Sequence, residues 1–234
     1  MSPPAPASNS ASATTRDASG LYRLTPTAQL RAGKTARRLI QLSIGLVLYA
    51  LSMALIMRSG LGMLPWDVLH YGLARHLPLS LGTVVVLTSL TVLLTWIPIR
   101  QMPGIGTIAN AVFIGLLLDP VLRYLPVPEA LWLRILFLLA GVVINAVATA
   151  SYIGSHFGPG PRDGLMTGLA RATGRSLRLV RTGIEVTVVG VGWLLGGVVG
   201  FGTLLYALAI GPLTQFFLPR LSVRLEPRGP KSTG

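Results

Sequence analysis

The sequence predicts an all-α membrane protein with about six transmembrane helices in two inverted three-span repeats, each with a short re-entrant or interfacial helix. Three observations support this prediction. Of the 234 residues, 51% are hydrophobic and only 12% are charged, too few polar groups to cover a soluble fold of this size. Several apolar runs approach the roughly 20 residues that cross a bilayer. Finally, the second half of the chain repeats the first.

The expected spans are apolar runs separated by short polar or glycine-rich segments. They centre on 39–57, 82–99, 104–122, 132–153, 179–198 and 202–219. Two shorter apolar stretches, 63–77 and 160–173, have lengths that suit half-helices or interfacial segments better than full spans. The count becomes five or seven if one of the short stretches crosses, or if one of the weaker runs does not.

The net charge of +13 comes from basic residues in the tails and loops. This placement orients membrane helices, whereas a nucleic-acid-binding protein would gather the charge on one face, so we expect no nucleic-acid partner. The excess of Lys and Arg places both termini in the cytoplasm and favours an even number of spans. The chain then divides into a disordered cytoplasmic tail (1–37), repeat 1 (38–125), repeat 2 (131–220) and a basic C-terminal tail (221–234).

A shift of 96 residues aligns 38–115 with 134–211 without a gap, and 26 of the 78 paired positions are identical. The matches include informative residue types: Arg38 with Arg134, Gly62 with Gly158, Pro65 with Pro161, and Asp67 with Asp163. Three crossings per repeat is an odd number, so the second copy enters the membrane from the opposite side, as in many secondary transporters. An even number of crossings per repeat would make the two copies parallel.

Charges at membrane depth cost about 2.5–3.5 kcal/mol each on insertion scales, so each one needs a structural or functional reason. The candidates for a substrate site or pathway are Asp67, Asn110, Arg162, Asp163, Arg181 and Glu185. The secondary candidates are Thr107, Asp119 and Thr203.

Each charged candidate has a structural and a functional interpretation. Asp67 and Asp163 follow a proline by two residues, which suits simple helix initiation as well as a site framed by helix N-termini near mid-membrane. Arg162 is either an anion-binding donor or an ordinary inner-side charge. Arg181 and Glu185 are four residues apart, so they can pair on one helix face, as a neutral structural pair or as a proton-coupling or substrate-binding element.

The uncharged and peripheral candidates are expected near span ends or between helices. Asp119 and Arg123 are predicted to form an interfacial ion pair, and Asn110 to bond between helices or line a cavity. Thr107 and Thr203 are expected at the start of the last span of each repeat. A four-residue glycine step at 192, 196 and 200 predicts close helix packing.

Several segments carry a family resemblance. They are the run from Gly158 to Met166 (Gly-Pro-Gly-Pro-Arg-Asp-Gly-Leu-Met), the segments 180–185, 192–197, 200–203 and 210–212, and Pro65-Trp66-Asp67 with 104–107, Asn110 and Asp119 in the first half. Over about residues 38–220 the chain resembles the YczE family of bacterial membrane proteins, relatives of the YitT family. The resemblance implies a multi-pass protein of the bacterial inner membrane and supplies no substrate.

Two functions remain open from the sequence. One is a small-solute transporter or channel-like protein with a site between inverted repeats, and the other is a non-transporting membrane scaffold or accessory protein. Beyond the lipid bilayer, the expected partners are a small-molecule or ion substrate, another membrane protein or a second copy of the chain. No enzyme activity, cofactor or metal is expected, because the chain has no cysteine or Walker-type loop and its three histidines lack ligand spacing.

Overall fold

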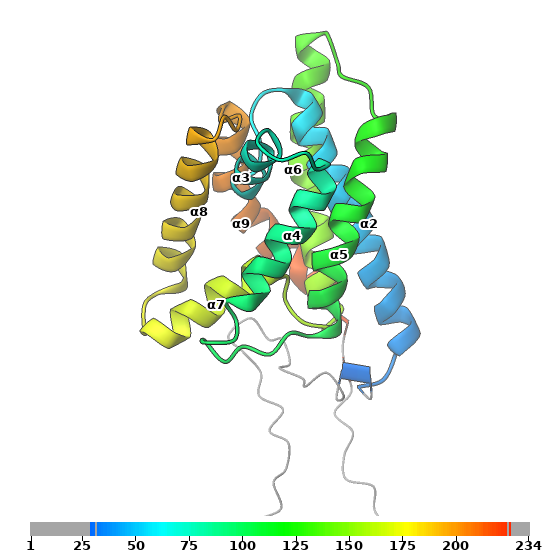
Figure 1. Cartoon of the computed structure of the whole chain (residues 1–234). Helices are drawn as coiled ribbons and strands as arrows, with labels where there is room; N and C mark the ends of the chain where they lie inside the picture. Colours follow the sequence, from blue (N-terminus) through cyan, green and yellow to red (C-terminus); the bar gives the residue numbers. More distant parts are fainter. Residues whose placement is uncertain (1–28, 31, 224, 226–234) are drawn as a thin grey trace, which may run out of the picture.

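The computed structural model describes residues 29–30, 32–223 and 225, and its secondary structure within these residues is helical, with no strand. The all-α prediction is therefore confirmed. The helices are α2 (Thr35–Ser59), α3 (Pro65–Ala74), α4 (Leu81–Leu94), α5 (Ile105–Tyr124), α6 (Leu131–Gly154), α7 (Pro161–Thr173), α8 (Leu177–Leu194) and α9 (Phe201–Leu221), as shown in Figure 1.

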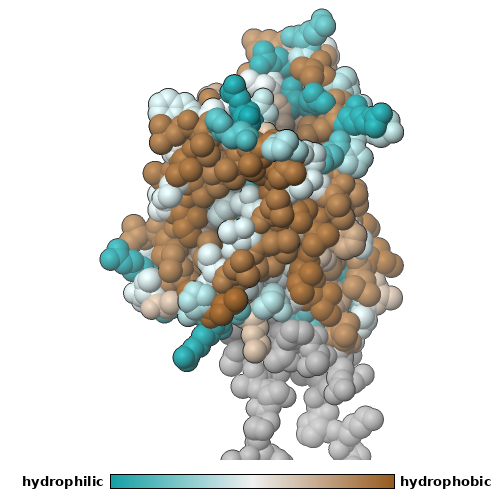
Figure 2. Space-filling view, viewed as in Figure 1, coloured by the Kyte–Doolittle hydropathy of each residue, from teal (hydrophilic) through white to brown (hydrophobic). Residues whose placement is uncertain are grey.

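Four of these helices, α2, α5, α6 and α9, are long and apolar enough to cross a membrane. Apolar side chains cover the middle of the face in Figure 2, which is the surface expected of a protein embedded in lipid. The run predicted as a span over 82–99 is shorter than expected. Its helix α4 has 14 residues, about 21 Å at 1.5 Å per residue, and the chain turns after Leu94. Helix α8 has 18 residues and carries the charged side chains of the predicted fifth span.

The two short segments form short helices, as predicted. Pro65 and Pro161 occupy the first helical positions of α3 and α7, where proline's fixed φ and missing N–H are tolerated. Asp67 and Asp163 follow in the first turn of each. In Figure 1, α3 lies near the top of the bundle and α7 near the bottom.

Helices α2 and α6 form the centre of the bundle, with α5 packed against α2 and α9 against α6. Their close approach depends on two glycines at equivalent repeat positions. A Cβ added at Gly45 would lie 3.0 Å from the backbone nitrogen of Tyr152, and one at Gly141 would lie 2.5 Å from Cγ1 of Ile56. Small residues at these contacts let the two backbones pack together, as is common between membrane helices.

An arginine at the start of each central helix bonds to the end of the other. Arg38 Nε donates to Ser155 O at 2.7 Å, and Arg134 Nε donates to Ser59 O at 2.7 Å. A second nitrogen of each guanidinium donates to the following carbonyl, at 3.0 Å in both cases. These contacts satisfy carbonyls that have no donor within their own helix. They also show that α2 and α6 run antiparallel.

The predicted tails fall largely outside the described residues. Of the part that is described, Gln29 is buried and contacts the bundle at two points. Its carbonyl accepts a hydrogen bond from Nη1 of Arg38 at 2.6 Å, and its side chain accepts one from the backbone of Ile105 at 3.2 Å. This residue of the predicted tail therefore packs against the starts of α2 and α5.

The two repeats differ in how α4 and its counterpart α8 pack. Helix α4 lies against α5, where a Cβ at Gly82 would stand 2.2 Å from the carbonyl oxygen of Gly115. Helix α8 makes far less contact with α9 and packs against α3 and α7 instead. A Cβ at Gly211, the counterpart of Gly115, would meet no heavy atom within 4 Å.

The predicted glycine stripe is wrong as a helical feature, because α8 ends at Leu194. Gly192 does permit close packing, since a Cβ there would lie 2.5 Å from the backbone nitrogen of Leu69 in α3. Gly196 instead turns the chain with a φ of 86°, and Gly200 is the residue before α9.

Candidate functional site

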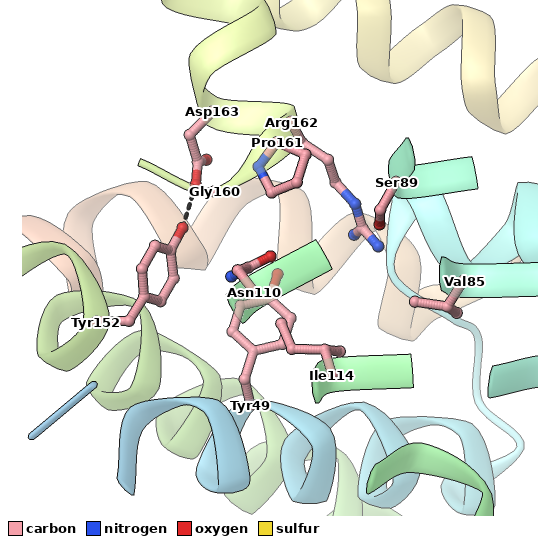
Figure 3. Close-up of a pocket in the computed structure, with 10 residues that line it drawn as sticks. All are labelled: Tyr49, Val85, Ser89, Asn110, Ile114, Tyr152, Gly160, Pro161, Arg162 and Asp163. Carbon is pink, nitrogen blue, oxygen red and sulfur yellow. Dashed lines mark hydrogen bonds between the residues drawn. The ribbon is translucent and has the colours of Figure 1, made fainter. Parts of the chain in front are cut away.

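A small polar pocket lies between the two repeats, at the start of α7. Helices α2, α4 and α5 contribute Tyr49, Val85, Ser89, Asn110 and Ile114, and the second repeat contributes Tyr152, Gly160, Pro161, Arg162 and Asp163 (Figure 3). Its cavity volume is about 30 Å³, which is room for one or two water molecules. Asn110, Arg162 and Asp163 were predicted as site residues, and the structure brings them together here.

Arg162 is the central charge of this pocket. Its guanidinium lies over the ring of Trp66, 5.2 Å from the centroid. No carboxylate among the described residues forms an ion pair with it. In Figure 3 the side chain extends toward Ser89, in a different direction from Asp163. Most donors of the guanidinium are thus left to face the pocket.

Asp163 is held on the other side of the pocket by Tyr152, whose hydroxyl donates to the Oδ2 carboxylate oxygen. The short helix α7 starts here because Gly160 adopts an extended backbone and Pro161 fixes the first turn. Trp96 of α4 secures this start, since its Nε1 donates to the carbonyl of Pro161 at 3.1 Å. The helix start therefore places one cation and one carboxylate beside the amide of Asn110.

Asp67 occupies the equivalent place in α3 but has a different partner. Its Oδ1 lies 3.1 Å from Nδ1 of His70, and both side chains are fully buried. Three buried atoms of this turn have no hydrogen-bond partner in the described part of the chain: Asp67 Oδ2, His70 Nε2 and Trp66 Nε1. Asp67 does not line the pocket, but Tyr49 lies within electrostatic reach of Asp67, Arg162 and Asp163 together.

A second buried polar group links α2, α6 and α9. The Tyr206 hydroxyl donates to Oδ1 of Asn145 at 2.8 Å, and Nδ2 of Asn145 donates to Ser52 at 2.7 Å. Under the 96-residue shift Asn145 corresponds to Tyr49, and Tyr206 corresponds to Asn110. The equivalent positions of the first half therefore hold the same two residue types in exchanged order, and both of these residues line the pocket.

Arg181 and Glu185 form the predicted pair, with Arg181 Nε 2.9 Å from Glu185 Oε1. They do not line the pocket. The side chains are partly exposed on α8, at 39% and 18%, although Arg181 lies within electrostatic reach of Asp163. The structure places this pair beside the site rather than in it.

The secondary candidates have structural positions. Thr107 and Thr203 lie in the first turns of α5 and α9, as predicted, and each accepts a hydrogen bond from the backbone before its own helix. The prediction that Asp119 pairs with Arg123 is wrong. Its carboxylate accepts from the backbone N–H of Gly82 at 2.8 Å and forms no ion pair with Arg123. An unpaired N–H at the start of α4 is available to the carboxylate at this point.

Sequence reasoning missed Tyr49, Tyr152 and His70 as members of the polar centre. Their signal was weak, because a tyrosine or histidine in an apolar run does not reveal its neighbours. The repeat alignment contained one clue, since His70 corresponds to Met166 and Tyr152 to Ile56. Each polar side chain replaces an apolar one near an otherwise matched aspartate.

No group of three or more His, Asp or Glu side chains able to hold a metal ion occurs in the described part of the chain. The charged groups of the centre instead have organic partners, namely an indole, a phenol and an imidazole. Together with the apolar helices, this arrangement defines a helical membrane protein with a polar pocket inside its bundle.

Comparisons with known proteins identify the family. Residues 36–219 match the model of a family of unknown function (DUF6198). The chain is 41% identical over 181 residues to an uncharacterized protein of Haemophilus influenzae, with 75% of this chain and 83% of the relative covered. It is 34% identical over 178 residues to the uncharacterized membrane protein YczE of Bacillus subtilis, with the same two coverages. The uncharacterized protein YyaS of that organism is 27% identical over 180 residues, covering 75% of this chain and 90% of the relative.

No solved structure matches the chain. The protein belongs to the DUF6198 family and is a YczE-like membrane protein. The resemblance predicted from the sequence is confirmed.

Proposed function

We propose that this protein is a small-solute transporter or channel-like protein of the bacterial inner membrane, with its site between two inverted repeats. The observation that carries the proposal is the pocket at Arg162, which is lined by side chains of both repeats. The guanidinium of Arg162 contacts the Trp66 ring but forms no ion pair with a carboxylate of the described residues, and a charge inside a membrane bundle is costly without a compensating partner. A polar solute or its hydration shell would supply that partner.

The inverted arrangement is supported by the reciprocal contacts of Arg38 and Arg134. Two antiparallel helices that exchange identical end contacts are related by a two-fold axis perpendicular to them. Trp66 and Arg162 are repeat partners and contact each other, so this axis passes close to the pocket. If α2 and α6 cross the bilayer, the axis lies in the membrane plane, the arrangement found in many secondary transporters.

In this proposal α4 and α8 complete six spans, and both termini lie in the cytoplasm. The 21 Å length of α4 is short for a ~30 Å hydrocarbon core, so its ends would reach polar groups of the protein rather than the bilayer surface. The Asp119 carboxylate of α5, which accepts from Gly82 at the start of α4, and the turns after Leu94 provide such groups. Short or interrupted helices beside a repeat interface are the typical location of transporter sites.

The alternative is a non-transporting scaffold, which would keep the centre closed to water. Ser89→Cys distinguishes the two, because the chain has no other cysteine. Leu87→Cys on the same helix is the matched control: Leu87 is 47% exposed on the outside of the bundle, whereas Ser89 is 5% exposed and lines the pocket. The probe is a small, charged, membrane-impermeant methanethiosulfonate applied to intact cells and to inverted vesicles.

A transporter or channel predicts that the thiol at position 89 reacts from at least one side. The thiol at position 87 should not react, because lipid covers it. Failure of Ser89→Cys to react from either side, in protein that reacts fully after denaturation, would contradict the proposed function.

A further inference from the structure

The polar centre of the bundle has an unbalanced formal charge. Asp67 and Asp163 contribute two carboxylates, and Arg162 contributes one guanidinium. Arg162 and Asp163 line the same pocket, and Arg162 lies over the ring of Trp66, the residue before Asp67. The remaining charges nearby, Arg181 and Glu185, neutralise each other at 2.9 Å. The centre therefore carries one uncompensated negative charge in apolar surroundings, where an unpaired charge is expensive.

The two aspartates differ in the side chain that each contacts, and therefore in how each could bind a cation that balances the charge. Asp163 accepts a hydrogen bond from the phenol of Tyr152. Asp67 instead lies against the imidazole of His70, a group that can bind one proton and become a cation. Paired carboxylates in different surroundings commonly take different roles in proton chemistry. The repeat partner of His70 is Met166, so only the first half has a histidine beside its aspartate.

The three atoms of this turn that lack a hydrogen-bond partner suit the binding of a proton better than the binding of a metal cation. In one tautomer, Nδ1–H of His70 donates to Asp67, which leaves Nε2 as an acceptor without a protein partner. The neighbouring Trp66 Nε1 is a donor only, and an N–H pointing at a metal ion would be repelled. Sodium and similar ions prefer a set of oxygen ligands. Asp67 Oδ2 is the one free oxygen in this group.

We propose that Asp67 and His70 form a proton-binding site whose occupancy neutralises the polar centre and couples protons to the movement of solute. One proton passes from a hydronium ion of the surrounding water, which is left as neutral water, and forms an N–H bond at Nε2 of His70. The centre changes from a formal charge of −1 to zero, and release of the proton restores it. The coupling role rests on the transport function proposed above, whereas the proton site itself does not.

The groups that interact electrostatically with this pair are Arg162 from α7, Tyr49 from α2 and Tyr206 from α9. Helix α8, which packs against α3, carries Arg178, Arg181 and Glu185. Helix α4, which also contacts α3, contains no titratable residue. Burial is the main effect on His70 and lowers its pKa, and the charge of Arg162, which contacts Trp66, lowers it further. Asp67 raises the pKa of His70 through its hydrogen bond and its charge.

The site can be tested on the purified full chain without any solute. The Trp66 and His70 rings lie 6.5 Å apart, and a protonated imidazole quenches indole fluorescence more strongly than a neutral one. The Trp66 signal is obtained as the difference between the native chain and Trp66→Phe. It should fall along a single-proton titration curve as the pH is lowered.

Three variants of the native chain identify the groups that titrate. His70→Gln should abolish the curve. Asp67→Asn should move its midpoint about 1–3 pH units lower, because the imidazolium loses the carboxylate beside it. His76→Gln is the control, since His76 lies on the exposed side of the same short segment and should leave the curve in place. A curve that survives in His70→Gln, or that does not move in Asp67→Asn, would overturn the assignment.

Two further measurements cover other outcomes. If His70→Gln does not fold, ¹⁵N-histidine NMR compares the native chain with Asp67→Asn. The titration midpoint of His70 should be lower in Asp67→Asn, whereas that of His156, the other buried histidine, should not change; absence of a titrating imidazole that responds to Asp67→Asn overturns the proton site. Replacing choline chloride by sodium chloride at constant ionic strength should change nothing. A sodium-dependent change in the Trp66 signal would identify a metal cation as the ligand and overturn the assignment to a proton.

Coupling is tested with the pocket thiol. The labelling rate of Ser89→Cys is divided by that of Ser89→Cys/His70→Gln at each pH, which cancels the titration of the thiol itself. The ratio should change over the pH range of the Trp66 curve. A constant ratio overturns the coupling but leaves the transport proposal standing, whereas a Ser89→Cys thiol that is unreactive at every pH overturns the transport proposal.

Discussion

Replacement of Arg38 by methionine should strongly destabilise the bundle, because this side chain joins three segments of the chain. Its guanidinium is fully buried and donates to the carbonyls of Ser155, His156 and Gln29 at 2.7, 3.0 and 2.6 Å. It also lies over the ring of Phe157, 4.3 Å from the centroid. Methionine keeps part of the apolar stem and removes every donor.

The magnitude follows from these three bonds. Hydrogen bonds from a charged donor contribute about 1.5–3 kcal/mol each, so three of them give about 4.5–9 kcal/mol before the cost of burying the guanidinium is subtracted. Subtracting a desolvation cost of about 3 kcal/mol leaves an expected loss of roughly 1.5–6 kcal/mol for Arg38→Met. Arg134→Met should cost roughly half as much, because Arg134 donates to two carbonyls and is partly exposed.

The assay is equilibrium unfolding of the purified chain in mixed detergent micelles, followed by far-ultraviolet circular dichroism. Arg38→Lys is a useful third variant, because an ammonium on a flexible stem cannot reproduce the fixed fork of a guanidinium. The free energy of unfolding of Arg38→Lys should lie between those of the native chain and of Arg38→Met. A loss below about 1 kcal/mol for Arg38→Met, which is the size of a single ordinary hydrogen bond, would refute this account of the helix ends.

Three further changes test other parts of the structure by the same unfolding measurement. Gly45→Leu should destabilise by about 2 kcal/mol or more, because its side chain would enter the α2–α6 contact, whereas Gly211→Leu should stay within about 0.5 kcal/mol; equal effects would contradict the packing described. Asp119→Ala should cost about 1 kcal/mol by removing the acceptor for the Gly82 N–H, and a negligible loss would show that this bond contributes nothing. Trp96→Phe should lose about 1–3 kcal/mol through the missing bond to the start of α7, and unchanged stability would argue against that anchor.

Much of the fold follows from local sequence. Hydrophobic run length identifies the long helices, and a proline two residues before an aspartate marks the start of each short one. The repeat alignment singled out Arg38 and Arg134 as equivalent residues. It could not reveal that each reaches the far end of the other repeat's first helix, because that contact depends on two helices lying antiparallel and close.

The candidate site was predictable in part. Arg162 and Asp163 attracted notice as charges in an apolar chain, and both line the pocket. Their neighbour Tyr152 did not, because an uncharged aromatic residue is ordinary in such a sequence. Asp119 was predicted to pair with Arg123 from sequence spacing alone. Its carboxylate instead accepts a hydrogen bond from the backbone N–H of Gly82, 37 residues away in sequence. Long-range partners of this kind require the three-dimensional arrangement.

The inverted arrangement of the repeats underlies the proposed transport function, and the sidedness of two matched loop residues tests it most directly. Leu79 and Arg175 occupy the same repeat position, both exposed, each just before the serine that caps the next helix. Leu79→Cys and Arg175→Cys would each carry the single thiol of the chain. An impermeant maleimide should label Leu79→Cys in intact cells, with the outer membrane permeabilised, and Arg175→Cys only in inverted inner-membrane vesicles. Labelling of both thiols from the same side would contradict the inverted repeats.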